Sequence, residues 1–133
     1  MLLLAAAIEE LGDLPGATVG IGPIVAAANA ARILERRKPS AVLMVGTCGA
    51  YPGGPAIGVA VTPSRCGLSP GVAAMGMGYV PRPPQPIACD PDLLDRIPLP
   101  RHDVLTVGAV TTDPKLVARL SDGWTVEHME AYG

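Results

Sequence analysis

Two short apolar runs, residues 2–7 and 41–45, flank a helical segment in the first third of the chain. Continuous apolar runs of this length are typical of strands that are buried on both faces. Between the runs, Pro23 suits the first position of a helix, and apolar residues follow it at helical spacing. The basic residues 36–38 suit the end of a helix, and Pro39 stops it. A strand, a helix and a strand in this order predict a parallel α/β unit.

Further short strands are predicted at residues 17–20 and 57–61. Residues 62–103 then lose periodicity, and 11 of the 15 prolines lie between residues 52 and 100. Proline cannot donate a hydrogen bond to a sheet, so we expect this stretch to be mostly loop, with a short helix around residues 90–96. We also expect it to be partly disordered or to be ordered by a partner subunit.

Regular patterns return in the last part of the chain. Residues 104–110 form a β-rich run, and residues 124–126 are consistent with one more strand. Between them, Asp113 and Pro114 are typical of the N-cap and the first residue of a helix. From Glu127 onward the pattern predicts the first turn of another helix. No internal repeat and no second domain is indicated, so a single α/β domain is expected.

The composition argues against several classes of function. Ten Lys and Arg stand against 12 Asp and Glu, giving a net charge of −2, so no basic surface for nucleic acid is indicated. The apolar N-terminus lacks the basic flank of a signal peptide and is too short to span a membrane. Cys48, Cys66 and Cys89 lie too far apart for a metal or disulfide pattern, so we expect no metal, no cofactor and a reducing, cytoplasmic location. The expected partners are a small molecule and further copies of the chain.

Candidate functional residues follow the predicted strands, where ligands bind in open α/β sheets. Glu10 comes after the first strand and could act as a general base toward water, or belong to a solvated acidic turn. After the strand at residues 41–45, the N–H groups around Thr47, Cys48 and Gly49 could hold an anion or a sugar oxygen, or form a plain tight turn.

Two further patterns involve a carboxylate and a pair of glycines. Met129 and Glu130 follow the last predicted strand, and a carboxylate there could bind two ribose hydroxyl groups. The alternative is a glutamate that suits the dipole of a first helical turn. Gly20 and Gly22 lack the third glycine of a dinucleotide-binding turn, since residue 25 is Val25, so we do not predict that cofactor.

Four segments, taken in order, resemble the nucleoside phosphorylase and nucleosidase superfamily. V-G-T-C-G-A at residues 45–50 resembles the V-G-[ST]-C-G-A segment of purine nucleoside phosphorylases. A-I-E-E at residues 7–10 is similar to the A-M-E-E-E opening of methylthioadenosine/S-adenosylhomocysteine nucleosidases, and G-I-G-P at residues 20–23 resembles their G-[IV]-G segment. E-H-M-E-A at residues 127–131 resembles E-N-M-E-G and V-E-M-E-A in futalosine hydrolases and related nucleosidases. The resemblance spans essentially the whole chain.

The resemblance implies a three-layer α/β/α fold around a mixed, largely parallel sheet, in a homodimer or a larger homo-oligomer. By the same resemblance, Glu10 positions the attacking water, and Thr47 lies near that water, or near phosphate in phosphorylases. Met129 and Glu130 match the residues that hold the ribose. The positions that match the approach to the base are Val110, Thr111 and Thr112.

The sequence departs from the family in three places. The segment before Gly20 is short, and Met44 stands where phosphorylases carry a phosphate-binding arginine. The chain ends at Gly133, before the family's next helix, its next strand and the aspartate that protonates the leaving base. We therefore expect residues 1–133 to form an incomplete domain of this type, truncated at the C-terminus, and to be a poor catalyst alone.

These patterns together predict a nucleosidase-like N-ribosyl hydrolase, with Glu10 and Glu130 as catalytic residues. Its substrate would be a purine-type nucleoside of the methylthioadenosine, S-adenosylhomocysteine or futalosine class. Two alternatives stay open: a phosphate-dependent nucleoside phosphorylase, and a truncated protein without catalysis that binds a nucleoside or pairs with itself.

Overall fold

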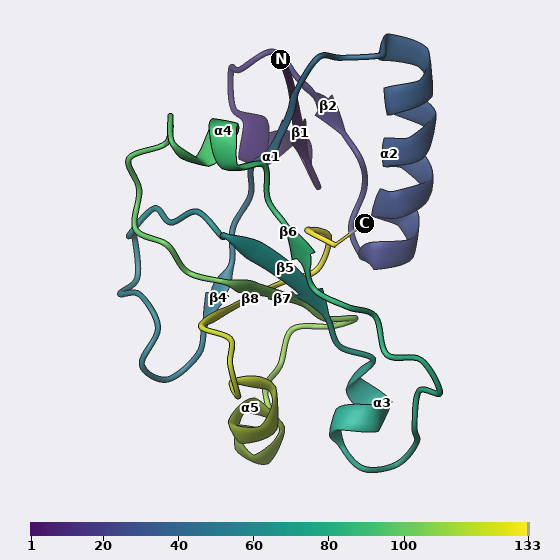
Figure 1. The fold of residues 1–133 in the computed structure, drawn as a ribbon, viewed down its shortest axis with the longest axis vertical. Coiled ribbons are helices and arrows are strands. Elements are labelled where there is room, and N and C mark those ends of the chain that lie inside the picture. Colours follow the sequence, from purple (N-terminus) through teal and green to yellow (C-terminus); the bar gives the residue numbers. More distant parts are fainter. Residues whose placement is uncertain (133) are drawn as a thin grey trace.

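The computed structural model describes residues 1–132, which form two β-sheets and the helices that pack on them (Figure 1). In chain order the elements of these residues are β1 (Leu2–Ala5), α1 (Ile8–Leu11), β2 (Ala17–Thr18), α2 (Pro23–Arg37), β3 (Val42–Met44), β4 (Gly49–Ala50), β5 (Arg65–Leu68), α3 (Gly71–Ala74), β6 (Ile87–Ala88), α4 (Pro91–Leu94), β7 (Val104–Thr106), α5 (Pro114–Leu120) and β8 (Val126–His128).

The first sheet has the strand order β2-β1-β3, and both pairings are parallel. Helix α2 connects β2 to β3 and packs on this sheet through Ala26, which contacts Leu2, Leu4 and Val19 in one buried cluster. The predicted strand, helix and strand at the start of the chain are thus confirmed as a parallel α/β unit.

The ends of α2 follow from local sequence. Gly22 is the N-cap residue, with φ at 92°, which suits glycine, and Pro23 occupies the first helical position. At the other end, Lys38 adopts a left-handed conformation, and its N–H donates a hydrogen bond of 2.8 Å to the carbonyl of Leu34. Pro39 follows and cannot continue the helix, as the sequence predicts.

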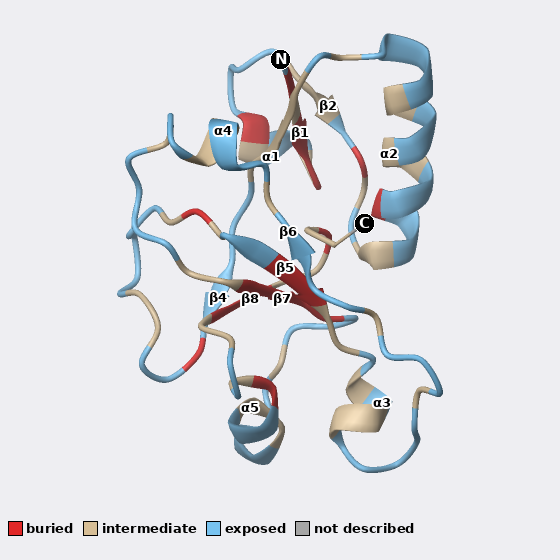
Figure 2. Ribbon diagram, in the orientation of Figure 1, coloured by how far each residue is buried: buried red, intermediate tan, exposed pale blue. Residues whose placement is uncertain are grey.

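The second sheet has the order β4-β8-β7-β5-β6. Its centre is parallel, since β7 pairs with both β5 and β8 in parallel, whereas the edge strands β4 and β6 pair antiparallel with their neighbours. Helix α5 covers β7 through Leu120, which packs with Leu105 and Val107. Figure 2 shows buried residues concentrated on β1, β7 and β8. The predicted α/β class with mixed, largely parallel strands is confirmed.

One prediction for the middle of the chain is wrong, and another is incomplete. Residues 57–61 form no strand: Gly58 lies in a turn with φ at 84°, and Ile57 is fully exposed. Residues 62–103 lie mostly outside helices and strands, as predicted, but they also contribute β5 to the interior of the second sheet and β6 to its edge, which were not predicted. The sequence R-C-G-L of β5 has no strand alternation, so its parallel pairing with β7 decides its conformation.

The prediction of a helix from Glu127 onward is also wrong. Glu127 and His128 belong to β8, where they pair with Leu105 and Thr106 of β7. The expected helices near residues 90–96 and after Asp113 are confirmed, and the Asp113 side chain accepts a hydrogen bond of 2.8 Å from the N–H of Leu116.

Two absences hold for residues 1–132. None of their helices has the length and apolar character needed to cross a membrane. Within the same residues, no group of three or more His, Cys, Asp and Glu side chains is arranged to hold a metal ion.

Candidate functional site

The ends of β1 and β3 bring Glu10 and Thr47 together, as expected from adjacent parallel strands. Oε1 of Glu10 accepts hydrogen bonds from the Thr47 N–H at 2.9 Å and from the Thr47 hydroxyl at 3.1 Å. Oε2 accepts from the N–H groups of Ala6 at 3.1 Å and Ala7 at 3.4 Å. The carboxylate is therefore held by four donors from two separate segments of the chain.

These donors set the charge of Glu10. Partial burial of the carboxylate raises its pKa, but the hydrogen bonds from Thr47, Ala7 and Ala6 stabilise the charged form and outweigh the burial. The pKa of Glu10 is therefore lower than its ordinary value. At neutral pH the side chain is an ionised carboxylate in a fixed orientation, which is the form that a general base requires.

Because Gly46 has no side chain, Glu10 and His128 can both approach the backbone at this position. A Cβ atom at Gly46 would lie 2.8 Å from Nε2 of His128 and 3.1 Å from Oε1 of Glu10. Both groups thus lie against the same small volume beside Gly46. A side chain at this position would push them apart, so glycine is required here by close approach.

Glu130 is a buried carboxylate at the N-terminus of α2. Its Oε1 accepts a hydrogen bond of 2.7 Å from the N–H of Gly22, the N-cap residue, where the helix dipole favours a negative charge. Its Oε2 lies 3.1 Å from Nδ1 of His128. Only 4% of Glu130 is exposed, so the hydrogen bond from Gly22 replaces part of the hydration that the carboxylate loses on burial.

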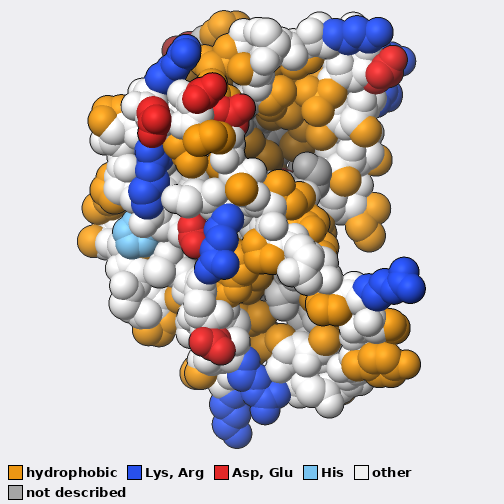
Figure 3. All heavy atoms as spheres, viewed as in Figure 1, with side chains coloured by type: hydrophobic (Ala, Val, Ile, Leu, Met, Phe, Trp, Pro, Cys, Tyr) orange, Lys and Arg blue, Asp and Glu red, His pale blue; other side chains and the backbone are white. Residues whose placement is uncertain are grey.

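Glu130 also lines an apolar cavity of about 220 Å³ between α2 and the first sheet. Figure 3 shows apolar side chains gathered in the hollow beside α2. The other lining residues are Leu4, Val19, Ala26, Ala30, Leu34, Val42, Met44 and Ala131. One buried carboxylate on an apolar wall can bind the hydroxyl groups of a ligand whose remaining surface is apolar.

The predicted base-binding residues belong to a different cluster. The N–H and hydroxyl of Thr111 donate to Glu127 at 2.8 and 2.6 Å, and the Tyr51 hydroxyl donates to the same carboxylate at 2.8 Å. Burial, together with the Glu127 carboxylate, raises the pKa of Tyr51 well above its ordinary range. Val110 and Thr112 are exposed beside this cluster. Among residues 1–132, no hydrogen bond joins Val110, Thr111 or Thr112 to Glu10.

The remaining predicted site residues lie in different surroundings. Cys48 is exposed next to Thr47, and partial burial of its thiol raises its pKa. Gly49 is in β4, opposite Glu127 of β8. The side chain of Met129 is partly buried and packs against the apolar cluster of the second sheet. The structure thus brings Glu10 and Thr47 together, places Glu130 on the other side of His128, and packs Met129 against the second sheet.

His128 and Glu127 are the residues that sequence reasoning missed. Successive side chains of a strand point to opposite faces. In β8 Glu127 therefore faces Tyr51, whereas His128 faces Gly46. Past the end of the strand, Met129 packs against the apolar cluster of the second sheet, and Glu130 accepts a hydrogen bond from Gly22. A strand assignment at Glu127 and His128 would have placed these two side chains on opposite faces of the sheet.

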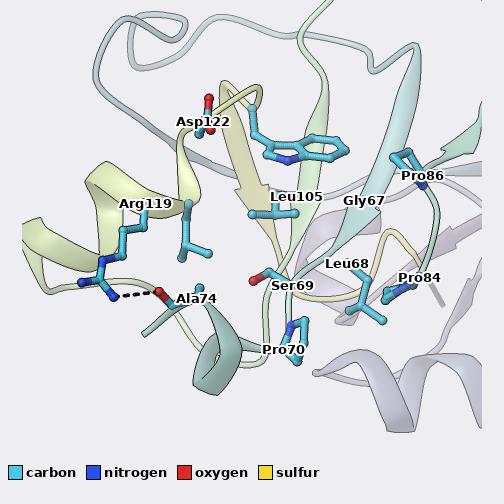
Figure 4. Close-up of a pocket in the computed structure, with 12 residues that line it drawn as sticks. Gly67, Leu68, Ser69, Pro70, Ala74, Pro84, Pro86, Leu105, Arg119 and Asp122 are labelled. Atoms are coloured by element: carbon cyan, nitrogen blue, oxygen red, sulfur yellow. Dashed lines mark hydrogen bonds between the residues drawn. The ribbon is translucent and has the colours of Figure 1, made fainter. Parts of the chain in front are cut away.

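A second cavity, of about 280 Å³, lies between the second sheet, α3 and α5 (Figure 4). Trp124 covers the backbone of Gly67 there, and the guanidinium of Arg65 lies 4.8 Å from the centre of the indole ring. The guanidinium of Arg119 donates a hydrogen bond of 3.0 Å to the carbonyl of Ala74. This cavity contains none of the predicted site residues.

The fold has counterparts among solved structures. No family model matches the chain, and no curated protein matches it. The likeness is to solved structures of 5′-methylthioadenosine/S-adenosylhomocysteine nucleosidases. The enzyme from Campylobacter jejuni aligns with a TM-score of 0.79 at 18% identity, covering 98% of this chain and 75% of that one.

Two further structures give the same result. The nucleosidase from S. pneumoniae with the transition-state inhibitor MT-ImmA aligns with a TM-score of 0.78 at 17% identity. The enzyme from Neisseria meningitidis in complex with methylthio-immucillin-A aligns with a TM-score of 0.76 at 19% identity. Each alignment covers 98% of this chain and 75% of the other. At these identities the likeness establishes the fold.

Proposed function

We propose that this chain is a nucleosidase-like N-ribosyl hydrolase that cleaves the bond between the ribose and the base of a purine-type nucleoside. The observation that carries the proposal is that His128 lies between the two carboxylates: Nδ1 is 3.1 Å from Oε2 of Glu130, and Nε2 borders the space beside Gly46 that Glu10 also borders. The likeness of the fold to nucleosidases, one of them in complex with methylthio-immucillin-A, supports the choice of substrate class.

The proposed reaction uses the two carboxylates differently. Glu10, ionised and held by four donors, accepts a proton from a water molecule. The water oxygen forms a bond to the anomeric carbon of the ribose, the bond to the base breaks, and its electron pair leaves with the base, which takes a proton from solvent. Glu130 stabilises the positive charge that develops on the ribose.

The geometry favours hydrolysis over phosphorolysis. A phosphate ion would need free donors at the turn after β3, but the N–H and hydroxyl of Thr47 already donate to Glu10. A second anion beside that carboxylate would be repelled. Met44 carries no positive charge that could bind phosphate, and its side chain lines the apolar cavity.

Self-association in the cytoplasm is part of the same proposal. Large apolar side chains are well exposed in several segments of the chain, and water contact with them is unfavourable. They include Ile24, Ile57, Met77, Tyr79 and Val110. We expect light scattering of the purified chain to give the mass of a dimer or a larger assembly.

The proposal is tested by measuring release of free base from methylthioadenosine, S-adenosylhomocysteine, futalosine and inosine, with and without added phosphate. We expect release that does not depend on phosphate and that falls in Glu10→Gln and in Glu130→Gln. Tyr79→Phe, at an exposed side chain distant from both carboxylates in sequence, is the control and should retain release. Release proportional to phosphate would indicate a phosphorylase, and the absence of both release and nucleoside binding would refute the proposal.

A further inference from the structure

Cys66 and Cys89, whose spacing along the chain predicts no disulfide pattern, are brought together by the second sheet. Strand β5 pairs antiparallel with the edge strand β6, and Cys66 lies opposite Ile87. The N–H of Cys89 continues this pairing with a hydrogen bond of 2.9 Å to the carbonyl of Ser64. Both cysteines are free thiols in the structure.

The two side chains share one buried cluster. Cys66, Val104 and Val126 form this cluster, and Cys89 packs against it. The thiol of Cys89 is close enough to contribute to the raised pKa of Cys66, although burial is the larger cause. We propose that Cys66 and Cys89 are a redox-sensitive pair that closes to a disulfide when a peroxide reaches the chain, and that this closure regulates the candidate site. The effect on nucleosides rests on the proposed function, whereas the disulfide itself does not.

The oxidation begins at Cys89, the more accessible of the two thiols, since Cys66 is buried. The sulfur of Cys89 attacks one oxygen of hydrogen peroxide, the O–O bond breaks, and a sulfenic acid and a water molecule form. The sulfur of Cys66 then bonds to the sulfenic sulfur, whose S–O bond breaks as a second water molecule leaves with the Cys66 proton. The two thiols lose two electrons, which reduce the peroxide to water. An excess of a small thiol reverses the reaction by exchange.

Closure of the disulfide should move β6 rather than β5. Cys89 is bonded to Ser64, two residues before Cys66, and such diagonal positions are about 7–8 Å apart in an antiparallel pair. The Cα atoms of a disulfide usually lie about 4.4–6.8 Å apart, so Cys89 must approach β5. Strand β6 comprises only Ile87 and Ala88 at the edge of the sheet and can shift, whereas β5 is held by β7 on its other side.

The segment before β6 connects this movement to the candidate site. The carbonyl of Gln85 accepts a hydrogen bond of 2.9 Å from the hydroxyl of Tyr132. Tyr132 and Ala131 also pack against the cluster that Cys89 contacts. Ala131 and Glu130 both line the cavity of about 220 Å³ beside α2. A shift of β6 therefore acts on the short segment that carries Glu130, and we expect oxidation to weaken nucleoside binding.

The disulfide is tested without substrate. The purified chain is treated with hydrogen peroxide, its remaining free thiols are blocked with iodoacetamide in urea, and its peptides are analysed by mass spectrometry. We expect a peptide pair linked through Cys66 and Cys89 that dithiothreitol separates. The same pair should form in Cys48→Ser, the matched control, and should be absent from Cys89→Ser. A bridge that involves Cys48, or Cys89 oxidised to a sulfinic acid while Cys66 stays free, would overturn the proposal.

The effect on the site is tested by comparing nucleoside affinity before and after peroxide. We expect oxidation to weaken the affinity about tenfold, as displacement of a binding group does, and dithiothreitol to restore it. Cys89→Ser keeps every methionine and the other two cysteines, so it controls for their oxidation and should keep its affinity in peroxide. Equal affinity of the oxidised and reduced parent chain would overturn the regulation. If the reduced chain binds no nucleoside, the proposed function fails, and the peptide analysis still decides the disulfide.

Discussion

The hydroxyl of Tyr51 donates a hydrogen bond of 2.8 Å to Oε2 of Glu127, which lies 76 residues later in the chain. Thr111 adds two more donors to the same buried carboxylate. A charge at this position is tolerated because these bonds replace water. The cluster ties β4, β8 and the segment before α5 into one unit.

Removing a donor from this cluster should destabilise the fold. We expect Tyr51→Phe to lower the free energy of unfolding by about 1–3 kcal/mol, because Glu127 stays buried with one partner fewer. Urea unfolding followed by circular dichroism measures the change. Tyr79→Phe is the matched control, since the Tyr79 side chain is 84% exposed and should give no change. Equal stability of the two variants would contradict the importance of the cluster.

A methyl group at Gly46 should disrupt the candidate site. In Gly46→Ala, the new Cβ would displace the imidazole of His128, the carboxylate of Glu10, or both. We expect nucleoside affinity or turnover to fall by about tenfold or more, because a misplacement near 1 Å has large effects in active sites. Gly71→Ala is the control, since a Cβ at Gly71 meets nothing within 4 Å. Unimpaired binding in Gly46→Ala would mean that ligands do not use this volume.

The close contact between Gly67 and Trp124 should matter for the stability of the second sheet. A Cβ at Gly67 would overlap the indole ring of Trp124. We expect Gly67→Ala to lower the free energy of unfolding by about 1–3 kcal/mol, as overpacking does, and to shift the fluorescence of the single tryptophan. Urea unfolding and an emission spectrum are the measurements, with Gly71→Ala again as control. A variant with native emission and native stability would refute this contact.

Glu10 should contribute stability that depends on pH. Its pKa is lower in the folded chain than the ordinary value of 4.5, so its contribution is present above pH 4.5 and is lost as the pH falls through the folded-state pKa. We therefore expect Glu10→Gln to destabilise the chain at pH 7 and to have a smaller effect at pH 3. Unfolding in urea at the two pH values gives the comparison. The opposite order would mean that Glu10 is not held as a carboxylate.

The cysteines should differ in reactivity. Burial and the neighbouring Cys89 raise the pKa of Cys66 to about 12, and Cys66 is buried, so its thiolate is scarce and shielded. Cys48 is exposed beside Thr47. We expect iodoacetamide to modify Cys48 first and Cys66 last, as measured by peptide mass spectrometry. A bound nucleoside should slow the labelling of Cys48. An unchanged labelling rate in the presence of the nucleoside would mean that the ligand binds elsewhere.

Several parts of the fold could be predicted from the sequence because their causes are local. The ends of α2 depend on Gly22, Pro23 and Pro39, and the start of α5 depends on Asp113, whose side chain caps its own helix. Each of these effects acts within a few residues along the chain. The runs that became β1 and β3 were recognised because they are continuous and apolar. Glu10 and Thr47 could be predicted to meet because adjacent parallel strands end at the same edge.

The tertiary structure alone decided the conformation of β5 and of the segment that begins at Glu127. The sequence of β5 has no strand pattern, and E-H-M-E is compatible with a helical turn. Nevertheless β5 became a strand, and so did Glu127 and His128, because β7 offers hydrogen bonds on its two sides. A strand is completed by partners that lie far away in sequence, so its local residues do not determine it. That choice turned His128 toward Glu130 and Gly46, and turned Glu127 toward Tyr51.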